Sequence, residues 1–541
     1  MPADIQRNLF GTARPGVLIE PAPYVTVAMA SATPPPPLSD PRPTGLAQRS
    51  IGALKWNYLG TGVKVTSQLI IGIVLARLLG PEPFGLIAVA WLMLGLGNLI
   101  ADSGLSVALI QKQTISARDI RYVFTLQILA GLGLTLLALM ASPWIAAFFG
   151  RADAVPVLRW MSLLFVLQAF GQTATALLRR DLDHKRVQLL QVFSYLAAYL
   201  LLGLPLAFSG WGVWALVIAQ LTQTVLYSAA AYLSVRHSLT PTFRAEQSGL
   251  FRFGSKVLGS NLTSWGISYF DSAIIGRMLG MVDLGFYNRS MNLLASPMNA
   301  AVSTLQGVLL PFYSRLQGRT GDARDTYLAT ICFLSAILAP AFAAIAAIPE
   351  TTMLAVYGQQ WQAAAVLITP LALAMPINAM LALGGPMMQG MGRAGMEAVS
   401  QGVGLIVLII AVIAAARISL AAVAWAVLGV YLLRAWLVTR LAAGLVFAPA
   451  SAFLRALVGP LLLAVLAFSL AWSADHWLAA SLSHPGVRFI VVMGAAAITV
   501  MFAIGLWGRW IFCAEAKTLM HKARPHLAPR MGSLLLRWSG T

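Results

Sequence analysis

The sequence predicts an all-α polytopic membrane protein with about 14 transmembrane helices, arranged as two parallel six-helix lobes around a central cleft plus two C-terminal helices. Three observations carry this prediction: the composition, an internal duplication and the distribution of positive charge. Of the 541 residues, 59% are hydrophobic and only 10% are charged, and the mean hydropathy is +0.78. Soluble proteins carry about 25% charged residues, so lipid rather than water solvates most of this chain.

A short motif occurs twice, 200 positions apart. The sequence RLLG at 77–80, followed by Gly85, recurs as RMLG at 277–280, followed by Gly285. Each copy lies between the end of one apolar span and the start of the next, and six spans separate the copies. Both copies therefore lie on the same side of the bilayer, as expected for two six-helix halves in parallel orientation.

Apolar runs long enough to cross about 30 Å of hydrocarbon as helices recur along the chain. The predicted spans are 52–78, 85–109, 120–148, 155–178, 187–208, 212–235, 253–278, 285–311, 325–348, 362–388, 397–416, 420–441, 452–473 and 488–510.

The spans divide the chain into five segments. They are a disordered, Pro-rich leader (1–48), an N-terminal lobe with spans 1–6 (49–240), a C-terminal lobe with spans 7–12 (241–445), two accessory spans (446–512) and a basic cytoplasmic tail (513–541). The leader lacks the charged start and long apolar centre of a signal peptide, and Met29 is an alternative start to Met1.

The loop charges test this topology. With the N-terminus in the cytoplasm, the inner loops carry about 16 Lys and Arg residues and the outer loops about 6. This bias predicts that both termini are cytoplasmic, and a model with one span fewer or more would reverse its sign. The net charge of +19 is spread over short loops rather than gathered on one domain, which argues against nucleic acid as a partner.

Polar residues recur inside the apolar spans, where they are costly unless they face protein or water. In span 285–311 they follow steps of three and four, so they share one helix face over about 25 Å. These residues are Arg289, Asn292, Ser296, Asn299, Ser303 and Gln306. The first span carries Asn57, Thr61, Lys64 and Gln68, the seventh carries Asn261, Ser264, Ser268 and Asp271, and the fourth carries Gln168, Gln172, Thr175 and Arg179.

The duplication reappears in these polar faces. Adding 200 to Thr61, Lys64 and Gln68 gives Asn261, Ser264 and Ser268. The first helix of each lobe therefore presents an equivalent polar face, as expected for two walls of one hydrated cleft.

Two interpretations of the polar residues remain open. They can join helices by hydrogen bonds worth about 0.6 to 2 kcal/mol each, and we expect this of the isolated Gln220 and Gln223. One polar residue at every turn of 285–311 favours a water-filled cavity instead.

The charged residues within the spans can likewise either pair with other residues of the protein or face a water-filled cavity. Lys64 lies at mid-membrane, where an unpaired cation costs at least about 2.5 kcal/mol, so it requires water, an anionic ligand or a carboxylate such as Asp102 or Asp271. Lys256, Arg289 and Arg434 lie nearer the interfaces and can extend towards the lipid headgroups. Asp102 and Asp271 are candidates for proton or sodium coupling, with structural pairing as the alternative.

The sequence contains no phosphate-binding loop, no metal-ligand spacing and no long loop that could hold a catalytic site. We therefore expect no enzyme activity, no catalytic residues, no cofactor and no metal. The two cysteines, Cys332 and Cys513, are interpreted as buried thiols.

Two regions resemble a known family. Residues 284–289 (LGFYNR), Pro297 and 308–317 (VLLPFYSRLQ) are similar to bacterial polysaccharide exporters, as are the first two spans from Lys55 through 76–80 (ARLLG). These exporters are the Wzx-type oligosaccharide flippases, close to the colanic-acid exporter branch of the multidrug/oligosaccharidyl-lipid/polysaccharide superfamily. The resemblance is clear from Ser50 to Gly444 and weak over the last two spans.

This resemblance implies two lobes that alternate between inward- and outward-open states in the bacterial inner membrane. The implied cargo is an undecaprenyl-pyrophosphate-linked oligosaccharide, moved from the cytoplasmic to the periplasmic leaflet for exopolysaccharide or lipopolysaccharide biosynthesis. In relatives, cations on the first and eighth helices line the cavity and meet the lipid pyrophosphate, and Lys64 and Arg289 occupy such positions. Further implied partners are membrane lipids, a polysaccharide polymerase and a chain-length regulator.

Two other functions fit the same architecture. A cation-coupled multidrug or small-molecule exporter predicts acidic residues in the cavity, and Asp271 is the main support for it. A non-transporting scaffold for a polysaccharide synthase complex predicts no cleft, which the duplicated polar faces oppose.

Overall fold

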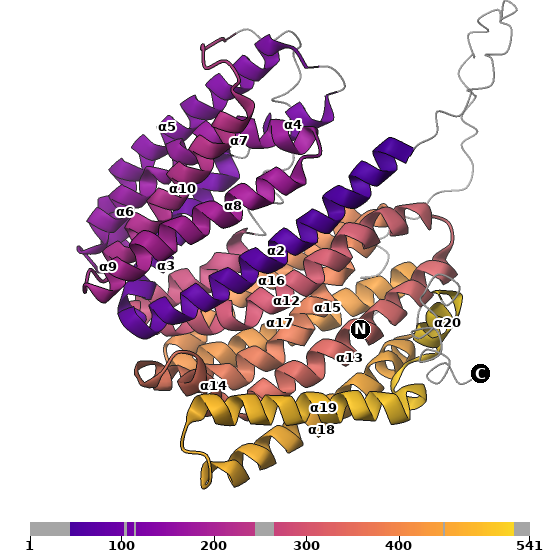
Figure 1. Cartoon of the computed structure of the whole chain (residues 1–541). Coiled ribbons are helices and arrows are strands. Elements are labelled where there is room, and N and C mark those ends of the chain that lie inside the picture. The colour runs from indigo at the N-terminus through magenta and orange to yellow at the C-terminus, as the bar shows by residue number, and fades with distance from the viewer. Residues whose placement is uncertain (1–43, 102–104, 113–114, 244–264, 447–448, 524–541) are drawn as a thin grey trace, which may run out of the picture. The chain divides into compact units, whose positions relative to one another are not determined.

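The computed structural model describes residues 44–101, 105–112, 115–243, 265–446 and 449–523, and in this part of the chain every regular element is a helix (Figure 1). The packing described below is that within Ser50–Thr541, which forms one compact unit. We call residues 49–240 the N-terminal half and residues 241–445 the C-terminal half.

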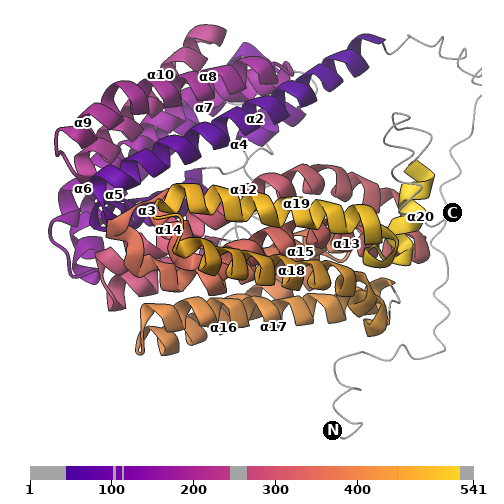
Figure 2. The same cartoon turned by 60° about the horizontal axis from the view of Figure 1, so that its bottom comes forward.

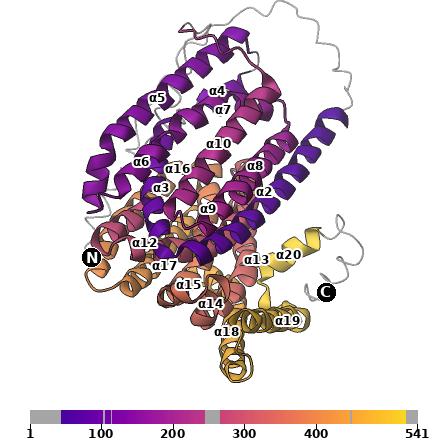
Figure 3. The ribbon, with the colours of Figure 1, turned by 60° about the vertical axis from the view of Figure 1, so that its left-hand side comes forward.

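The helices of the N-terminal half are α2 (Thr44–Leu79), α3 (Pro81–Ala101), α4 (Leu105–Gln111), α5 (Ala117–Phe148), α6 (Ala154–Ser162), α7 (Leu164–Arg180), α8 (His184–Ala198), η1 (Tyr199–Gly203), α9 (Leu204–Phe208) and α10 (Val213–Val235). Helix α5 begins with a capping box, in which the Ser116 hydroxyl accepts from the Asp119 N–H and the Asp119 carboxylate accepts from the Ser116 N–H. Within this half, α7 packs between α5 and α10, and α10 also contacts α8 (Figure 3).

In the C-terminal half, residues 265–278 are helical. The elements that follow are α12 (Met281–Arg315), α13 (Thr320–Ala347), α14 (Pro349–Val356), η2 (Gln359–Ala364), α15 (Ala365–Gly390), α16 (Ala394–Ala416) and α17 (Leu420–Val446). Helix α15 contacts α12, α13 and α17, and α16 packs on α17.

The C-terminal helices are α18 (Ala450–Ala479), α19 (Pro485–Ile511) and α20 (Ala514–Ala523). Figures 1 and 2 show α18 and α19 side by side in yellow, with α18 packed on α13. At one end of this pair Arg488 forms an ion pair with Asp475 at 2.9 Å and donates to the Thr351 hydroxyl, so α14, α18 and α19 are joined there. The accessory pair is thus attached to the C-terminal half.

The duplicated motif has a structural explanation. Gly80 and Gly280 both have positive φ, +74° and +98°, in the tight turns that precede α3 and α12. Gly85 and Gly285 lie where α3 and α12 cross. A β-carbon built on Gly85 would be 1.9 Å from the Met281 carbonyl oxygen, and one built on Gly285 would be 2.0 Å from the Pro81 carbonyl oxygen. The motif therefore specifies two equivalent turns and one reciprocal helix crossing between the halves.

The all-helical membrane fold is confirmed, while the count of 14 spans stays a prediction. Among the described residues, 12 helices are long and apolar enough to cross a membrane. The predicted span 85–109 is not one of them; the structure divides it between α3 and α4 and does not describe 102–104. The predicted span 253–278 falls within the described residues only from position 265 onward.

Two predicted segments, the leader and the tail, can be compared with the structure only over part of their length. The leader (1–48) overlaps them only at 44–48, which already belong to α2, so that helix begins before the predicted boundary. The tail (513–541) begins with the short helix α20, and its remainder lies outside the described residues.

Candidate functional site

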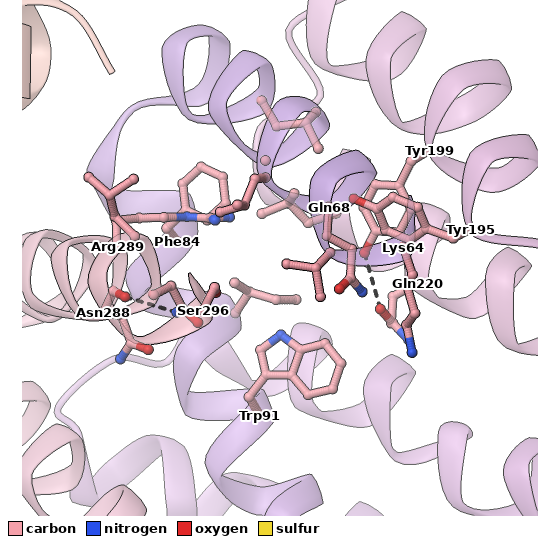
Figure 4. A pocket seen from close by; sticks show the side chains of 18 of the residues that line it. Lys64, Gln68, Phe84, Trp91, Tyr195, Tyr199, Gln220, Asn288, Arg289 and Ser296 are labelled. Atoms are coloured by element: carbon pink, nitrogen blue, oxygen red, sulfur yellow. Dashed lines mark hydrogen bonds between the residues drawn. The ribbon is translucent and has the colours of Figure 1, made fainter. Parts of the chain in front are cut away.

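A cavity of about 660 Å³ lies between the two halves, and we call it the central cavity. Helices α2, α3, α8 and α10 and the η1 segment supply its walls from the N-terminal half, and α12 supplies the facing wall from the C-terminal half (Figure 4). Its polar lining residues are Thr61, Lys64, Gln68, Gln220, Gln223, Asn288, Arg289, Asn292, Ser296, Asn299 and Ser303. The first and eighth predicted spans thus do face each other across one cavity.

Two cations line the central cavity from opposite sides (Figure 4). The Lys64 ammonium donates to the Gln191 side-chain oxygen at 3.1 Å. The Arg289 guanidinium lies 3.6 Å from the centre of the Phe84 ring, in a cation–π contact. Arg289 therefore faces the cavity rather than extending to the lipid headgroups, and the described lining residues include no carboxylate.

The polar face of α12 is divided between two cavities. Asn292, Ser296 and Asn299 line the central cavity, and the Asn292 amide donates to the Asn288 carbonyl at 2.8 Å. Gln306, one turn beyond Ser303, instead lines a smaller cavity within the C-terminal half and donates to the Ala382 carbonyl at 2.7 Å. The predicted continuous face therefore reaches the central cavity only as far as Ser303.

Aromatic side chains that the sequence analysis did not single out line the same space. Tyr195 and Tyr199 of the N-terminal half lie with ring centres 4.5 Å apart, and Trp91 lines another part of the cavity wall (Figure 4). Aromatic residues in apolar spans most often face lipid or core, so position in a span gives no indication of a cavity. The one sequence signal that could have indicated a shared surface is the spacing of Tyr195 and Tyr199, which lie one helical turn apart.

A cluster of four buried aromatic rings lies against one end of the central cavity. Trp361 is fully buried, and its ring contacts those of Phe84, Phe286 and Tyr357 at centre distances of 6.0, 5.8 and 5.2 Å. Its indole N–H donates to the Ala76 carbonyl at 2.9 Å. Because Phe84 and Tyr357 also line the cavity, we call these four rings the aromatic plug.

Hydrogen bonds join the two halves at the same end. Arg77 donates to the carbonyls of Val356, at 2.8 Å, and Ala355, and Gln360 donates to the Ala76 carbonyl at 3.2 Å. Five hydrogen bonds between helical elements of the two halves lie at this end. This end carries the turns at Gly80 and Gly280, so it belongs to the side that the loop charges assign to the exterior.

The N-terminal half holds a further cavity of about 470 Å³ that shares Lys64, Gln220 and Gln223 with the central cavity. The expectation that both glutamines only join helices is therefore incomplete. Gln220 accepts from the Tyr199 hydroxyl at 3.1 Å, as expected, but it also lines both cavities. Gln223 lines both without a hydrogen bond to protein among the described residues.

Asp271 does not pair with Lys64, which corrects that alternative. Asp271 is buried, its carboxylate accepts from the Tyr287 hydroxyl and the Ser272 N–H, both at 2.6 Å, and it does not line the central cavity. Asp102 lies outside the described residues, so a pair between it and Lys64 stays a prediction.

The remaining predicted site residues lie elsewhere or are not described. Ser268 is exposed on helix 265–278 and does not line the central cavity. The Asn57 side chain, Asn261 and Ser264 fall outside the description, so the proposed equivalence of the polar faces of the first and seventh spans is untested.

Sequence comparison finds relatives in polysaccharide biosynthesis. The chain is 27% identical over 324 residues to the succinoglycan biosynthesis transport protein ExoT of Rhizobium meliloti, an alignment that covers 59% of this chain and 65% of ExoT. It is 24% identical to the teichuronic acid biosynthesis protein TuaB of Bacillus subtilis, covering 75% of this chain and 85% of TuaB. Identity to the lipopolysaccharide biosynthesis protein WzxC of Escherichia coli is 21%, covering 58% and 65%. The chain thus spans about 65% of the length of ExoT and of WzxC.

Solved structures share the fold. A lipid II flippase MurJ in an inward-closed conformation matches with a TM-score of 0.64 at 12% identity, covering 82% of this chain and 98% of MurJ. An inward-facing multidrug-resistance MATE transporter matches with a TM-score of 0.57 at 15% identity, covering 72% and 98%. At these identities the likeness concerns the fold alone.

A family model described as polysaccharide biosynthesis protein matches residues 74–366, more than half of the chain. The matched region runs from the end of α2 through α12 and the aromatic plug to the start of α15, and so includes Arg289 and most of the central cavity. The chain is a multi-pass membrane protein that belongs to the polysaccharide biosynthesis protein family.

Proposed function

We propose that this protein flips lipid-linked oligosaccharides across the bacterial inner membrane by alternating access, with undecaprenyl pyrophosphate as the lipid carrier. The observation that carries the proposal is the central cavity, which presents two cations and a row of uncharged polar groups in the middle of an apolar bundle. Family membership and relatives named for transport and biosynthesis of polysaccharides support it.

The chemistry of the cargo explains this lining. A sugar head group cannot enter hydrocarbon because its hydroxyls would lose their hydrogen bonds to water. Asn292, Ser296 and Asn299 replace those bonds without adding charge, while the lipid tail stays in the bilayer.

The two cations suit an anionic carrier. In the proposal, Lys64 and Arg289 attract the pyrophosphate from the two sides of the cavity. If two negative charges move outward with the carrier, a membrane potential of 100 mV contributes about 4.6 kcal/mol to the step. The potential can then drive flipping without a dedicated ion site, and the polymerase and chain-length regulator of the pathway are the expected partners.

The lining also weighs against the rival exporter. A cation-coupled drug exporter requires acidic groups in its cavity, whereas the described lining of this one contains none and Asp271 lies outside it. The closed end at the aromatic plug is compatible with a state loaded from the cytoplasm, given the orientation predicted from the loop charges.

Reconstitution of the full-length protein tests the proposal. Proteoliposomes would carry undecaprenyl-pyrophosphate-linked oligosaccharide with a fluorescent sugar, and flipping would be followed by the loss of protection from a membrane-impermeant quencher. We expect flipping that accelerates with an imposed potential and falls at least tenfold in the Lys64→Ala/Arg289→Ala double variant. Arg440→Ala, at an exposed cation outside the cavity, is the matched control and should flip at the wild-type rate. A wild-type protein that leaves the probe in its original leaflet contradicts the proposal.

A further inference from the structure

The cavity within the N-terminal half is lined by an unusual concentration of carboxamides. We call it the amide chamber, and its carboxamide residues are Asn98, Gln127, Gln168, Gln172, Gln191, Gln220 and Gln223. They project from five different helices, α3, α5, α7, α8 and α10, so they converge on one space rather than following one helix, and Lys64 enters from α2. All residues that line this cavity belong to the N-terminal half.

The carboxamide side chains differ in whether they form hydrogen bonds to other residues of the protein. Gln127 is buried and fixed, since it donates to the Ser106 hydroxyl at 3.0 Å and accepts from Thr173. Gln168, Gln172 and Gln223 have no hydrogen bond to protein within the part of the chain that the structure describes. Interhelical bonding therefore does not account for these three, whose polar groups face the chamber and are free for a ligand or water.

The charge of the residues that line the chamber limits which ligands can bind there. Lys64 and Arg179 line it, and its described lining includes no carboxylate. A carboxamide offers both donors and an acceptor, which matches the paired hydroxyls of a pyranose ring, while the two cations exclude a cationic sugar and tolerate an acidic one. The volume, about 470 Å³, lies within the range of about 300 to 1,000 Å³ typical of small-molecule sites.

We infer that the amide chamber is a sugar-binding subsite that holds part of the oligosaccharide, neutral or acidic, while its pyrophosphate lies in the central cavity. Lys64 lies on the boundary, because it lines both cavities and donates to Gln191 of the chamber. The N-terminal half then selects the sugar, whereas the pyrophosphate contact involves both halves. This inference rests on the proposed function and adds to it which residues contact the sugar.

The test compares binding of two lipids to the full-length protein in detergent. One probe is undecaprenyl pyrophosphate without sugar, and the other is the lipid-linked oligosaccharide fraction extracted from source cells that lack this protein. The variants are Gln172→Leu on α7 and Gln223→Leu on α10, so that misfolding of one leaves the other as a test. Gln389→Leu is the matched control, because Gln389 is a carboxamide in the separate cavity of the C-terminal half.

Each chamber variant should bind the sugar-bearing lipid about tenfold more weakly, the loss expected for one or two hydrogen bonds, and the sugar-free lipid within about twofold of wild type. The Gln389→Leu control should keep both affinities. If both chamber variants keep the wild-type ratio of the two affinities, the inference is wrong although the proposed function stands. If the wild-type protein binds neither lipid, the proposed function fails and the inference with it.

Discussion

Replacing Gly85 with alanine should push α3 and α12 apart at the crossing that joins the two halves. The new methyl carbon would lie 1.9 Å from the Met281 carbonyl oxygen, whereas a carbon–oxygen contact needs about 3.3 Å. The backbones must therefore separate locally by about 1.4 Å, and because the obstacle is backbone, no side-chain rotation relieves it. Overpacking of this kind costs about 1 to 3 kcal/mol.

The assay is thermal unfolding of the purified full-length protein, with two matched controls. Gly133 and Gly429 also lie in long helices, but a β-carbon at either would meet nothing within 4 Å. Alanine at these two sites should leave the melting temperature unchanged or raise it, because alanine favours a helix by up to about 1 kcal/mol over glycine. Gly85→Ala should melt below wild type and below both controls.

The duplicated motif allows a sharper test. Gly285 meets the Pro81 carbonyl oxygen at 2.0 Å across the same crossing, so Gly285→Ala should destabilise by a similar amount. The double variant should lose less than the sum of the two single losses, because one separation of the helices relieves both clashes. Fully additive losses, or a Gly85→Ala protein as stable as the controls, would refute the account of this crossing.

Three further outcomes are expected. Lys64→Arg should keep most flipping activity and Lys64→Ala should lose at least tenfold, since the cavity needs a cation there; equal rates for the two would remove Lys64 from the site. Trp361→Ala should open the aromatic plug, so that a membrane-impermeant maleimide added on the outer side labels a cysteine placed in the central cavity faster than it does with Trp361 present; unchanged labelling would show that the plug is not the barrier. The Arg151 guanidinium donates a hydrogen bond to the Asp153 carboxylate and lowers the pKa of that carboxyl. The pair therefore stabilises the fold fully above the ordinary carboxyl pKa of about 3.9, and this stabilisation is lost as the pH falls through the lower pKa of the folded state. Asp153→Asn should therefore lower the melting temperature slightly at pH 7 and by less at pH 3, with at most about 1 kcal/mol involved because the pair is half exposed.

The site was predictable where one helix carries its own pattern. On α12 the steps of three and four place Asn292, Ser296 and Asn299 on one face, and that face does line the central cavity. The pattern could not show where the cavity ends, and so it included Gln306, which lies in a neighbouring cavity. Periodicity fixes the direction of a side chain relative to its own helix but not what lies opposite.

Residues whose role depends on two helices escaped prediction. The sequence left water, an anionic ligand or an aspartate open as the partner of Lys64. Its described partner is Gln191, 127 positions away, and Asp271 is hydrogen-bonded to Tyr287 instead. Trp91 lines the cavity, while Trp510 is exposed on α19, although both lie in apolar spans. Hydropathy cannot separate such cases, because lipid and protein interior favour the same side chains.

The sequence by itself determined that this chain is a bundle of membrane helices, because only a helix satisfies its own backbone in hydrocarbon, and it revealed the duplication through a pair of turn-and-crossing motifs. Only the tertiary structure decided why Gly85 and Gly285 are glycines, which amides converge in the N-terminal half, and that Trp361 packs between the halves against Phe84 of the cavity wall. The physical reason is that each of these depends on backbones brought together from distant parts of the chain, and close approach between helices leaves no periodic trace in any one of them.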